Sequence, residues 1–338
     1  MATRTRGRAT IADVARQAGV DRAVVSKVLS GDPSLRVRGA TRERVRAAAA
    51  ALSYRPNFHA RGLARAQGGA VGLLVPVDNP LMVQIIAGAE EAASARGLLL
   101  WTTAHEGELT ERYLRLLQSG AVDAALVAGL RAGYSADQLL RDPRVPTLLV
   151  DRRTVGSERW VILDDERAAR LATEHLIARG HTRIGWAGGR AGVDTAQRRQ
   201  NGIRDAMAAA DLWLDPSWVV GTDYTPEGGA AAVMGIMRSE SRPTAIVAAD
   251  PNEALGAWHE LQRLGLRVPE DVSLIAIHQL PGEDYRVVPL TSVEMPLREL
   301  GRRSVELVLD APWDAPVRET LSDGYRVTDG ATVGPPRR

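Results

Sequence analysis

Basic and hydroxyl side chains suited to contacting nucleic acid gather in the N-terminal part of the chain. Residues 1–68 contain 14 Lys and Arg against 4 Asp and Glu, whereas the remaining residues contain 29 basic and 37 acidic side chains. Contacts between cationic side chains and phosphates supply most of the sequence-independent affinity of proteins for nucleic acid. The charge is equally compatible with a solvated basic surface, so the spacing of the residues has to decide between the two interpretations.

That spacing predicts a helix-turn-helix module. Thr10 and Asp13 form a capping-box pair before residues that repeat with helical period, and Gly19 ends this first helix. We expect helices at Ile11–Ala18, at Arg22–Leu29 and from Thr41 onward. Two short helices joined by a tight glycine turn, with a third to close the core, allow the second helix to enter the major groove of DNA. The side chains of the second helix that are left outside this core are Arg22, Ala23, Ser26 and Lys27.

From residue 70 onward, short aliphatic runs alternate with longer amphipathic stretches. This alternation predicts parallel sheets covered by helices on both faces, with ligands bound beyond the carboxyl ends of the strands. The strand-like runs are 70–75, 98–102, 124–128, 147–150, 161–163, 183–187, 245–248 and 273–277. The helix-like stretches are 81–96, 108–119, 166–179, 195–210, 226–238, 253–264 and 297–309.

Several kinds of chemistry find little support in the sequence. The chain contains no cysteine, which excludes disulfides, thiolate metal sites and cysteine nucleophiles. Gly188–Gly192 follows a predicted strand but lacks the spacing of a dinucleotide-binding loop, and Asp164 and Asp165 have no companion catalytic motif. The basic N-terminus leads into no apolar segment of the kind found in signal peptides. We therefore expect no catalytic residues, no metal site and no cofactor.

Long motifs carry a resemblance to the LacI/GalR family of bacterial regulators. The segment TIADVARQAGVDRAVVSKVLSGD at 10–32, followed by TRERVRAAAAALSYRPNFHARGLA at 41–64, resembles the family's DNA-binding region. LATEHLIARGHTRIGWAGG at 171–189 and PLTSVEMPLRELGRRSVELVLD at 289–310 resemble its second region. The resemblance implies an all-α helix-turn-helix domain joined to a two-lobed α/β domain of the periplasmic-binding-protein-like type I fold.

The resemblance also assigns the contacts with DNA. It implies that the start of the second helix reads bases, so that Arg22 could bond bidentately to a guanine, with Ala23 beside it and Lys27 one turn later. The residues that resemble the family's phosphate-positioning set are Thr10, Ser26 and Asn57. Two departures are Asp21, where Ser is usual, and Val24, where Thr is usual; Val24 could meet a thymine methyl.

Residues 56–64 resemble the family's hinge helix, which folds when two subunits meet on the operator. The resemblance implies that Leu63 wedges into the minor groove, with Arg61 in the same DNA-contacting segment. Gly62 lowers the intrinsic helicity of this segment, which fits a helix that is stable only with a partner. An ordinary linker helix is the alternative interpretation.

The predicted effector site departs from the pattern of sugar-sensing members. Arg199, three residues before a glycine, keeps the family's ligand-binding arginine. Ala249 replaces the usual Asn or Ser before Asp250, His278 replaces the usual Asp, and Leu81 and Met82 replace an aromatic pair. The further candidates for effector binding are Asp78, Asp151, Asp164 and Tyr224. Three alternatives stay open: a carbohydrate or sugar derivative, an anion matched to Arg199 and His278, and a different ligand or none. His278 is equally open to interpretation as a structural residue.

We therefore interpret the protein as a homodimeric repressor controlled by a small-molecule effector. An activator or dual regulator that responds to a non-sugar or anionic ligand is the alternative, and a solute-binding protein is a remote one. We expect palindromic operator DNA, an effector and a second copy of the chain as partners, no membrane, and a cytoplasmic location on the nucleoid. The expected domains are 9–56 (helix-turn-helix), 57–68 (hinge and linker) and 69–333 (effector binding and dimerisation). Within the last, we expect one lobe at about 69–162 and 291–317 and the other at about 163–290 and 318–333.

Overall fold

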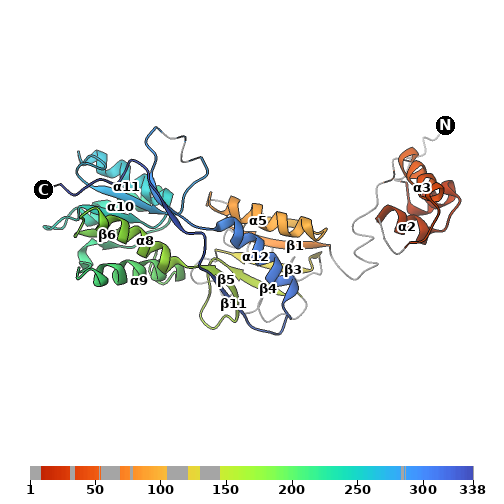
Figure 1. The fold of residues 1–338 in the computed structure, drawn as a ribbon, viewed down its shortest axis with the longest axis horizontal. Coiled ribbons are helices and arrows are strands. Elements are labelled where there is room, and N and C mark those ends of the chain that lie inside the picture. The colour runs from red at the N-terminus through yellow and green to blue at the C-terminus, as the bar shows by residue number, and fades with distance from the viewer. Residues whose placement is uncertain are drawn as a thin grey trace, which may run out of the picture. The chain divides into compact units, whose positions relative to one another are not determined.

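A computed structural model of the chain divides into two compact units, residues 1–69 and 70–338 (Figure 1). It describes residues 9–30, 35–52, 54, 69–76, 79–104, 121–129, 145–282, 285 and 287–337. Several predictions fall outside the described residues, namely those for Asn57, Arg61, Leu63 and Asp78 and for the helix at 108–119.

The N-terminal unit contains the predicted helices α1 (Ile11–Ala18), α2 (Arg22–Ser30) and α3 (Gly39–Ala51). The Thr10 side chain accepts a hydrogen bond from the Asp13 backbone while the Asp13 side chain bonds back to the Thr10 backbone, which completes the predicted capping box. Gly19 ends α1 with a left-handed φ of 64°, a conformation that costs glycine nothing. The three helices close on a core that includes Val14, Val25 and Val45.

The second unit contains two six-stranded sheets, one in each lobe. The first-lobe strands are β1 (Ala70–Val75), β2 (Leu99–Ala104), β3 (Ala124–Ala128), β4 (Thr147–Val150), β5 (Arg159–Leu163) and β11 (Val317–Leu321), in the order β11-β5-β4-β3-β1-β2. The second-lobe strands are β6 (Ile184–Ala187), β7 (Val219–Val220), β8 (Ala245–Ala248), β9 (Ser273–Ile277), β10 (Thr291–Glu294) and β12 (Arg326–Thr328), in the order β12-β10-β9-β8-β6-β7. Neighbouring strands are parallel except for the antiparallel pair β10 and β12.

Helices cover both faces of the second-lobe sheet. Alternate strand residues separate into two cores: Val247 packs with α8 (Asp165–Ala178) and α9 (Asp194–Ala209), whereas Ile246 packs with α10 (Pro226–Ile236) and α11 (Pro251–Arg263). A short 3-10 turn, η2 (Pro216–Trp218), precedes β7. This is the doubly wound arrangement that the alternating pattern predicts.

In the first lobe, α5 (Met82–Ala95) packs against α12 (Leu297–Asp310) (Figure 1). Glycines set the closeness of this pair. A Cβ on Gly88 would overlap the carbonyl of Arg298, and a Cβ on Gly301 would overlap the carbonyl of Ile85. Within the described part of the chain, no helix is long and apolar enough to cross a membrane.

The chain passes between the lobes at different points from those we predicted. It leaves the first sheet after Leu163, returns through Met295 and Pro296, and leaves again after Leu321. The predicted crossings near 162, 290 and 317 are therefore one to five residues early, because β10 belongs to the second sheet and β11 to the first. Both strands carry polar residues, and β11 is half exposed at a sheet edge, so neither forms the aliphatic run that identifies a buried strand.

Candidate functional site

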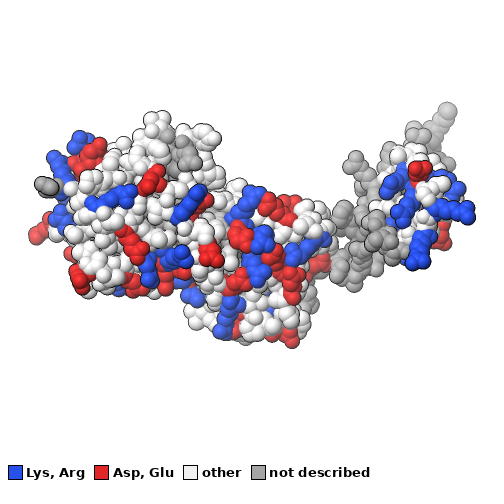
Figure 2. Space-filling model, in the orientation of Figure 1, with Lys and Arg blue, Asp and Glu red and all other residues white. Residues whose placement is uncertain are grey.

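The second helix of the N-terminal unit presents a polar face. Arg22, Ala23, Ser26 and Lys27 are exposed, as the spacing predicts, while Val25 and Val28 are buried beneath them. Figure 2 shows Lys and Arg side chains over the visible face of this unit. The face has the composition of a phosphate- and base-contacting surface.

Three neighbours of this face are already engaged within the unit. The Asp21 carboxylate accepts a hydrogen bond from the Ala23 backbone at 2.8 Å, so it serves as the cap of α2. The Thr10 hydroxyl donates to Asp13 at 2.7 Å in the capping box. Val24 is half-buried against the helical core, so only part of its side chain is available for contact.

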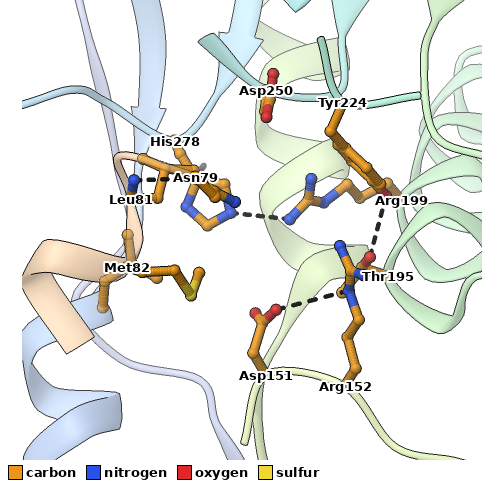
Figure 3. Close-up of a pocket in the computed structure, with 11 residues that line it drawn as sticks. Asn79, Leu81, Met82, Asp151, Arg152, Thr195, Arg199, Tyr224, Asp250 and His278 are labelled. Carbon is orange, nitrogen blue, oxygen red and sulfur yellow. Dashed lines mark hydrogen bonds and ion pairs between the residues drawn. The ribbon is translucent and has the colours of Figure 1, made fainter. Parts of the chain in front are cut away.

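A pocket lies between the two lobes of the second unit (Figure 3). The first lobe contributes an asparagine, an acid, an arginine and an apolar wall, namely Asn79, Leu81, Met82, Asp151, Arg152 and Leu297. The second lobe contributes polar and aromatic side chains, namely Thr195, Arg199, Tyr224, Asp250 and His278. Convergent polar groups beside an apolar wall are typical of small-molecule sites.

Two pocket residues stand at corresponding strand ends. Asp151 directly follows β4 and His278 directly follows β9, and each has a left-handed φ of 72°. This conformation is unfavourable for residues other than glycine and occurs preferentially at functional sites. Both residues lie at the carboxyl edges of their parallel sheets, where ligands bind in this class of fold.

The guanidinium group of Arg199 makes three polar contacts at the pocket. Its Nε donates to Asp165 at 2.6 Å, its Nη1 donates to the Ala249 carbonyl at 2.6 Å, and its Nη2 lies 2.8 Å from Nε2 of His278. Burial alone would lower the pKa of Arg199, but Asp165, with smaller contributions from Tyr224 and Asp151, outweighs burial and raises the pKa above its ordinary value. The guanidinium is therefore charged, and Asp165 already balances that charge.

Burial shifts the pKa values of His278, Asp151 and Asp250 in the pocket. The pKa of His278 is well below its ordinary value, first because the ring is buried and second because Arg199 is cationic. Burial also raises the pKa values of Asp151 and Asp250. Below the pocket, burial and the nearby Asp250 raise the pKa of Glu253 to about 9, although Thr222 donates a hydrogen bond to its carboxyl group at 3.0 Å.

Aromatic and cationic groups meet at one side of the pocket. Tyr224 shares a hydrogen bond of 3.1 Å with Thr195, and the Arg152 guanidinium lies 5.2 Å from the centre of the Tyr224 ring. Arg152 also lies 3.8 Å from the Asp151 carboxylate. The positive charge on this side therefore has an acidic neighbour as well.

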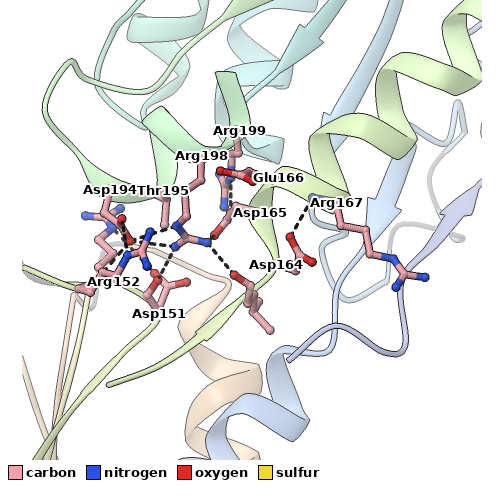
Figure 4. Close-up of polar contacts among 12 residues, drawn as sticks. Asp151, Arg152, Asp164, Asp165, Glu166, Arg167, Asp194, Thr195, Arg198 and Arg199 are labelled. Carbon is pink, nitrogen blue, oxygen red and sulfur yellow. Dashed lines mark hydrogen bonds and ion pairs between the residues drawn. The ribbon is translucent and has the colours of Figure 1, made fainter. Parts of the chain in front are cut away.

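Buried hydrogen bonds and a partly exposed ion pair connect the lobes beside the pocket (Figure 4). Arg198 of α9 donates to the first-lobe carbonyls of Leu163 at 2.6 Å and Asp151 at 3.2 Å. Asp194, at the start of α9, accepts from Arg198 and also from Arg153 of the first lobe at 3.0 Å. The position of α9 is thereby linked to the angle between the lobes.

The structure brings most of the predicted effector residues together. The predicted residues that line the pocket are Leu81, Asp151, Arg199, Tyr224, Asp250 and His278. Ala249 is not among the lining residues and contributes its carbonyl to Arg199.

Asp164 does not line the pocket. Its side chain caps α8 by accepting from the Arg167 backbone at 3.0 Å. Its neighbour Asp165 is the acid that contacts Arg199, because the start of α8 turns consecutive residues to different sides. The pocket also contains four residues that the sequence motifs did not indicate, namely Asn79, Arg152, Thr195 and Leu297, although the first two adjoin predicted residues in the NPLM and DRR segments.

Known proteins match this chain over most of its length. A model of bacterial regulatory proteins of the lacI family matches residues 10–57, and a model of a periplasmic binding protein-like domain matches residues 173–333. The HTH-type transcriptional repressor PurR of Aliivibrio salmonicida is 33% identical over 89% of this chain and 92% of its own length. The ribose operon repressor of Haemophilus influenzae is 31% identical over 89% of this chain and 91% of its own.

A solved structure agrees with these sequence matches. The lac repressor dimer bound to operator and the anti-inducer ONPF superposes with a TM-score of 0.83 at 25% identity, and the match covers 97% of this chain and all of that one. The relatives cover both the helix-turn-helix unit and the two-lobed unit, in the same order as here. The chain therefore belongs to the LacI family of bacterial regulatory proteins.

Proposed function

We propose that the protein is a sequence-specific transcriptional repressor that acts as a homodimer and releases or engages its operator in response to a small molecule. The observation that carries this proposal is the combination of an exposed, basic α2 face with a polar pocket between two lobes of the same chain. The relatives that share both parts are named as repressors. Because its target is operator DNA, the proposed place of action is the cytoplasm.

The DNA contacts follow from the exposed face and from the family pattern. The proposed base-reading residue is Arg22, with Ala23 beside it and Lys27 one turn later. The proposed phosphate contacts are Ser26 and Thr10. Thr10 would have to share its hydroxyl between DNA and Asp13. The proposed hinge contacts are Asn57, Arg61 and Leu63, which belong to the sequence segment 57–68 that we expect to form the hinge and linker.

The charges around the pocket favour a carbohydrate as the effector. Asp165 balances Arg199, and Arg152 has Asp151 within 3.8 Å. An anionic ligand would therefore add a charge to a site whose cations are already paired, at a desolvation cost. Hydroxyl groups can satisfy the buried acids and donors together, and Leu81, Met82 and Leu297 offer contact to C–H groups.

The interlobe contacts of α9 offer a route by which the effector could change DNA binding. A ligand that changes the angle between the lobes must also change the contacts of Arg198 and Asp194 with the first lobe. If that change favours a geometry that the operator disfavours, linkage requires each ligand to weaken the binding of the other by the same factor.

A gel-shift experiment on the DNA upstream of the protein's own gene tests this function. We expect a sequence-specific complex that survives excess non-specific DNA and is weakened by Arg22→Ala but not by Arg204→Ala, an exposed arginine of α9. The absence of any sequence-specific complex would contradict the proposal. Activation rather than repression of a reporter gene from the bound site would instead identify an activator.

A further inference from the structure

The hydrogen bond between Arg199 and His278 fixes which nitrogen of the histidine carries a proton. A guanidinium group can only donate, so Nε2 of His278, 2.8 Å from Nη2 of Arg199, must accept. A neutral imidazole that accepts at Nε2 carries its hydrogen on Nδ1. The buried position of the ring and the positive charge of Arg199 both keep it neutral, since each lowers the pKa of His278.

The Nδ1–H group thus produced has no partner among the residues that the structure describes. His278 is 3% exposed, so water does not solvate this donor freely. An unpaired buried donor is unfavourable until something accepts its hydrogen bond. His278 also lines the pocket, which makes a bound ligand the available acceptor (Figure 3).

Asp250 supplies the complementary atom. Its Oδ1 accepts from the Glu253 backbone at 2.8 Å, whereas its Oδ2 finds no partner within the described residues. Asp250 is 1% exposed and lines the same pocket. The pocket therefore holds one buried donor and one buried acceptor that are both unsatisfied.

Arg199 holds the donor in place rather than offering an unbalanced charge to the ligand. Asp165 fixes one edge of its guanidinium and the Ala249 carbonyl fixes Nη1, which leaves Nη2 directed at His278. Asp165 also pairs with Arg198 at 2.5 Å. A side chain clamped in this way acts as a positioning residue for the histidine.

We infer that His278, held as the Nδ1–H tautomer by Arg199, is the specificity-determining donor of the effector pocket, and that with Oδ2 of Asp250 it selects a neutral hydroxylated ligand over an anionic one. This inference rests on the proposed effector function of the pocket. The inference also explains the effect of having His278 in place of the usual acid. The side chain at this position accepts a hydrogen bond in the family pattern, whereas it donates one in this protein. The ligand group that faces His278 must accept a hydrogen bond, and the group that faces Asp250 must donate one.

Nitrogen NMR of the full-length protein tests the tautomer without any ligand. The chain has six histidines, and His278 is assigned by the signal that disappears in His278→Asn. We expect a neutral ring between pH 6 and 8 with the proton on Nδ1. His181 is an internal control with the opposite tautomer, because its Nε2 lies 2.8 Å from the Gly334 carbonyl, which can only accept. A proton on Nε2 of His278, or a cationic ring at pH 7, would overturn the inference.

Calorimetric titration tests the selectivity. The probes are neutral pentoses, hexoses and disaccharides, each paired with its phosphate ester or aldonic acid. We expect a neutral sugar to bind at least about 10-fold more tightly than its anionic counterpart, a difference of about 1.4 kcal/mol. His278→Asn keeps an N–H near the Nδ1 position and should bind that sugar within about 10-fold of the wild type, whereas His278→Asp offers only acceptors and should lose about 100-fold or more.

Each other outcome counts against the inference. Preferential binding of the anionic partners, full binding by His278→Asp, or binding of no neutral sugar at all would overturn the assigned ligand class. The gel shift separates these results from a failure of the proposed function, because sequence-specific operator binding by the wild type would persist whichever ligand class the pocket selects. Loss of operator binding by the wild type would remove the proposed function itself.

Discussion

Replacing Asp165 by asparagine should strongly destabilise the two-lobed unit, although the two side chains have nearly the same shape. Asp165 is 1% exposed and contacts two arginines that are themselves nearly buried, Arg198 at 2.5 Å and Arg199 at 2.6 Å. Asp165→Asn keeps the shape of the side chain but removes the negative charge that balances them. Removing one partner of a buried ion pair leaves an uncompensated charge and costs about 3–5 kcal/mol.

This loss can be measured by thermal unfolding followed through tryptophan fluorescence, since Trp186 is buried in the second lobe. For a unit of this size, a loss of about 3–5 kcal/mol lowers Tm by roughly 10 °C. The matched control is Asp205→Asn. Asp205 pairs with Arg170 at 3.7 Å, but both side chains are about half exposed, at 57% and 47%. An exposed pair of this kind contributes about 0–1 kcal/mol, so the control should melt near the wild type.

A Tm of Asp165→Asn within about 2 °C of the Tm of Asp205→Asn would contradict this prediction. That result would mean that water or another group screens the two guanidinium groups, and that burial alone does not make the carboxylate essential. It would also remove the argument that Arg199 is held in place for His278.

Three further predictions concern other parts of the molecule. Arg22→Ala should weaken operator binding by about 1–3 kcal/mol in fluorescence anisotropy, with an equal effect on operator and random DNA counting against base reading. Gly88→Ala, which would force a Cβ against the Arg298 carbonyl, should cost about 1–3 kcal/mol in urea unfolding, and unchanged stability would show that α5 and α12 can separate freely. Glu253, with a pKa raised to about 9 from the ordinary value of 4.5, is protonated in the folded state but not in the unfolded state between these two pH values. Its contribution to stability is therefore present below about pH 4.5 and is lost as pH rises toward 9, by at most about 1.4 kcal/mol per pH unit. Glu253→Gln should flatten this decline, and a difference between the two proteins that does not change from pH 5 to 9 would refute the assignment.

Elements that depend on near neighbours in sequence were predictable. The capping box of Thr10 and Asp13 and the left-handed Gly19 involve contacts within four residues, so the local residues specify them. The strands β1, β3, β4, β8 and β9 were predicted with their observed bounds because burial on both faces requires continuous aliphatic runs. By contrast, β10, β11 and β12 lie toward one edge of a sheet and contain polar residues, so their strand character depends on partners far along the chain.

The functional residues also divide into those that could be predicted from the sequence and those that depend on distant parts of the chain. The family resemblance predicted that Arg199, Asp250 and His278 share a site, and Asp250 and His278 meet there because the carboxyl ends of parallel strands converge. Only the tertiary structure decided that Asp165, and not Asp164, faces Arg199, since the phase of α8 determines which of two adjacent acids points inward.

The architecture follows from the amino-acid sequence alone: a basic helix-turn-helix unit with a defined exposed face, followed by two βα lobes. Helix caps, the periodicity of hydrophobic residues and the charge distribution depend on residues that are close in sequence, so they can be recognised without a structure. What the tertiary structure decided is the chemistry of the pocket. Burial and Arg199 together keep His278 neutral, and Arg199 selects its tautomer. Asp165 balances the charge of Arg199. The members of these two pairs are 79 and 34 positions apart along the chain. Hydrogen-bond direction and burial arise only when such distant residues meet, which is why the sequence left an anionic effector open and the folded pocket favours a neutral one.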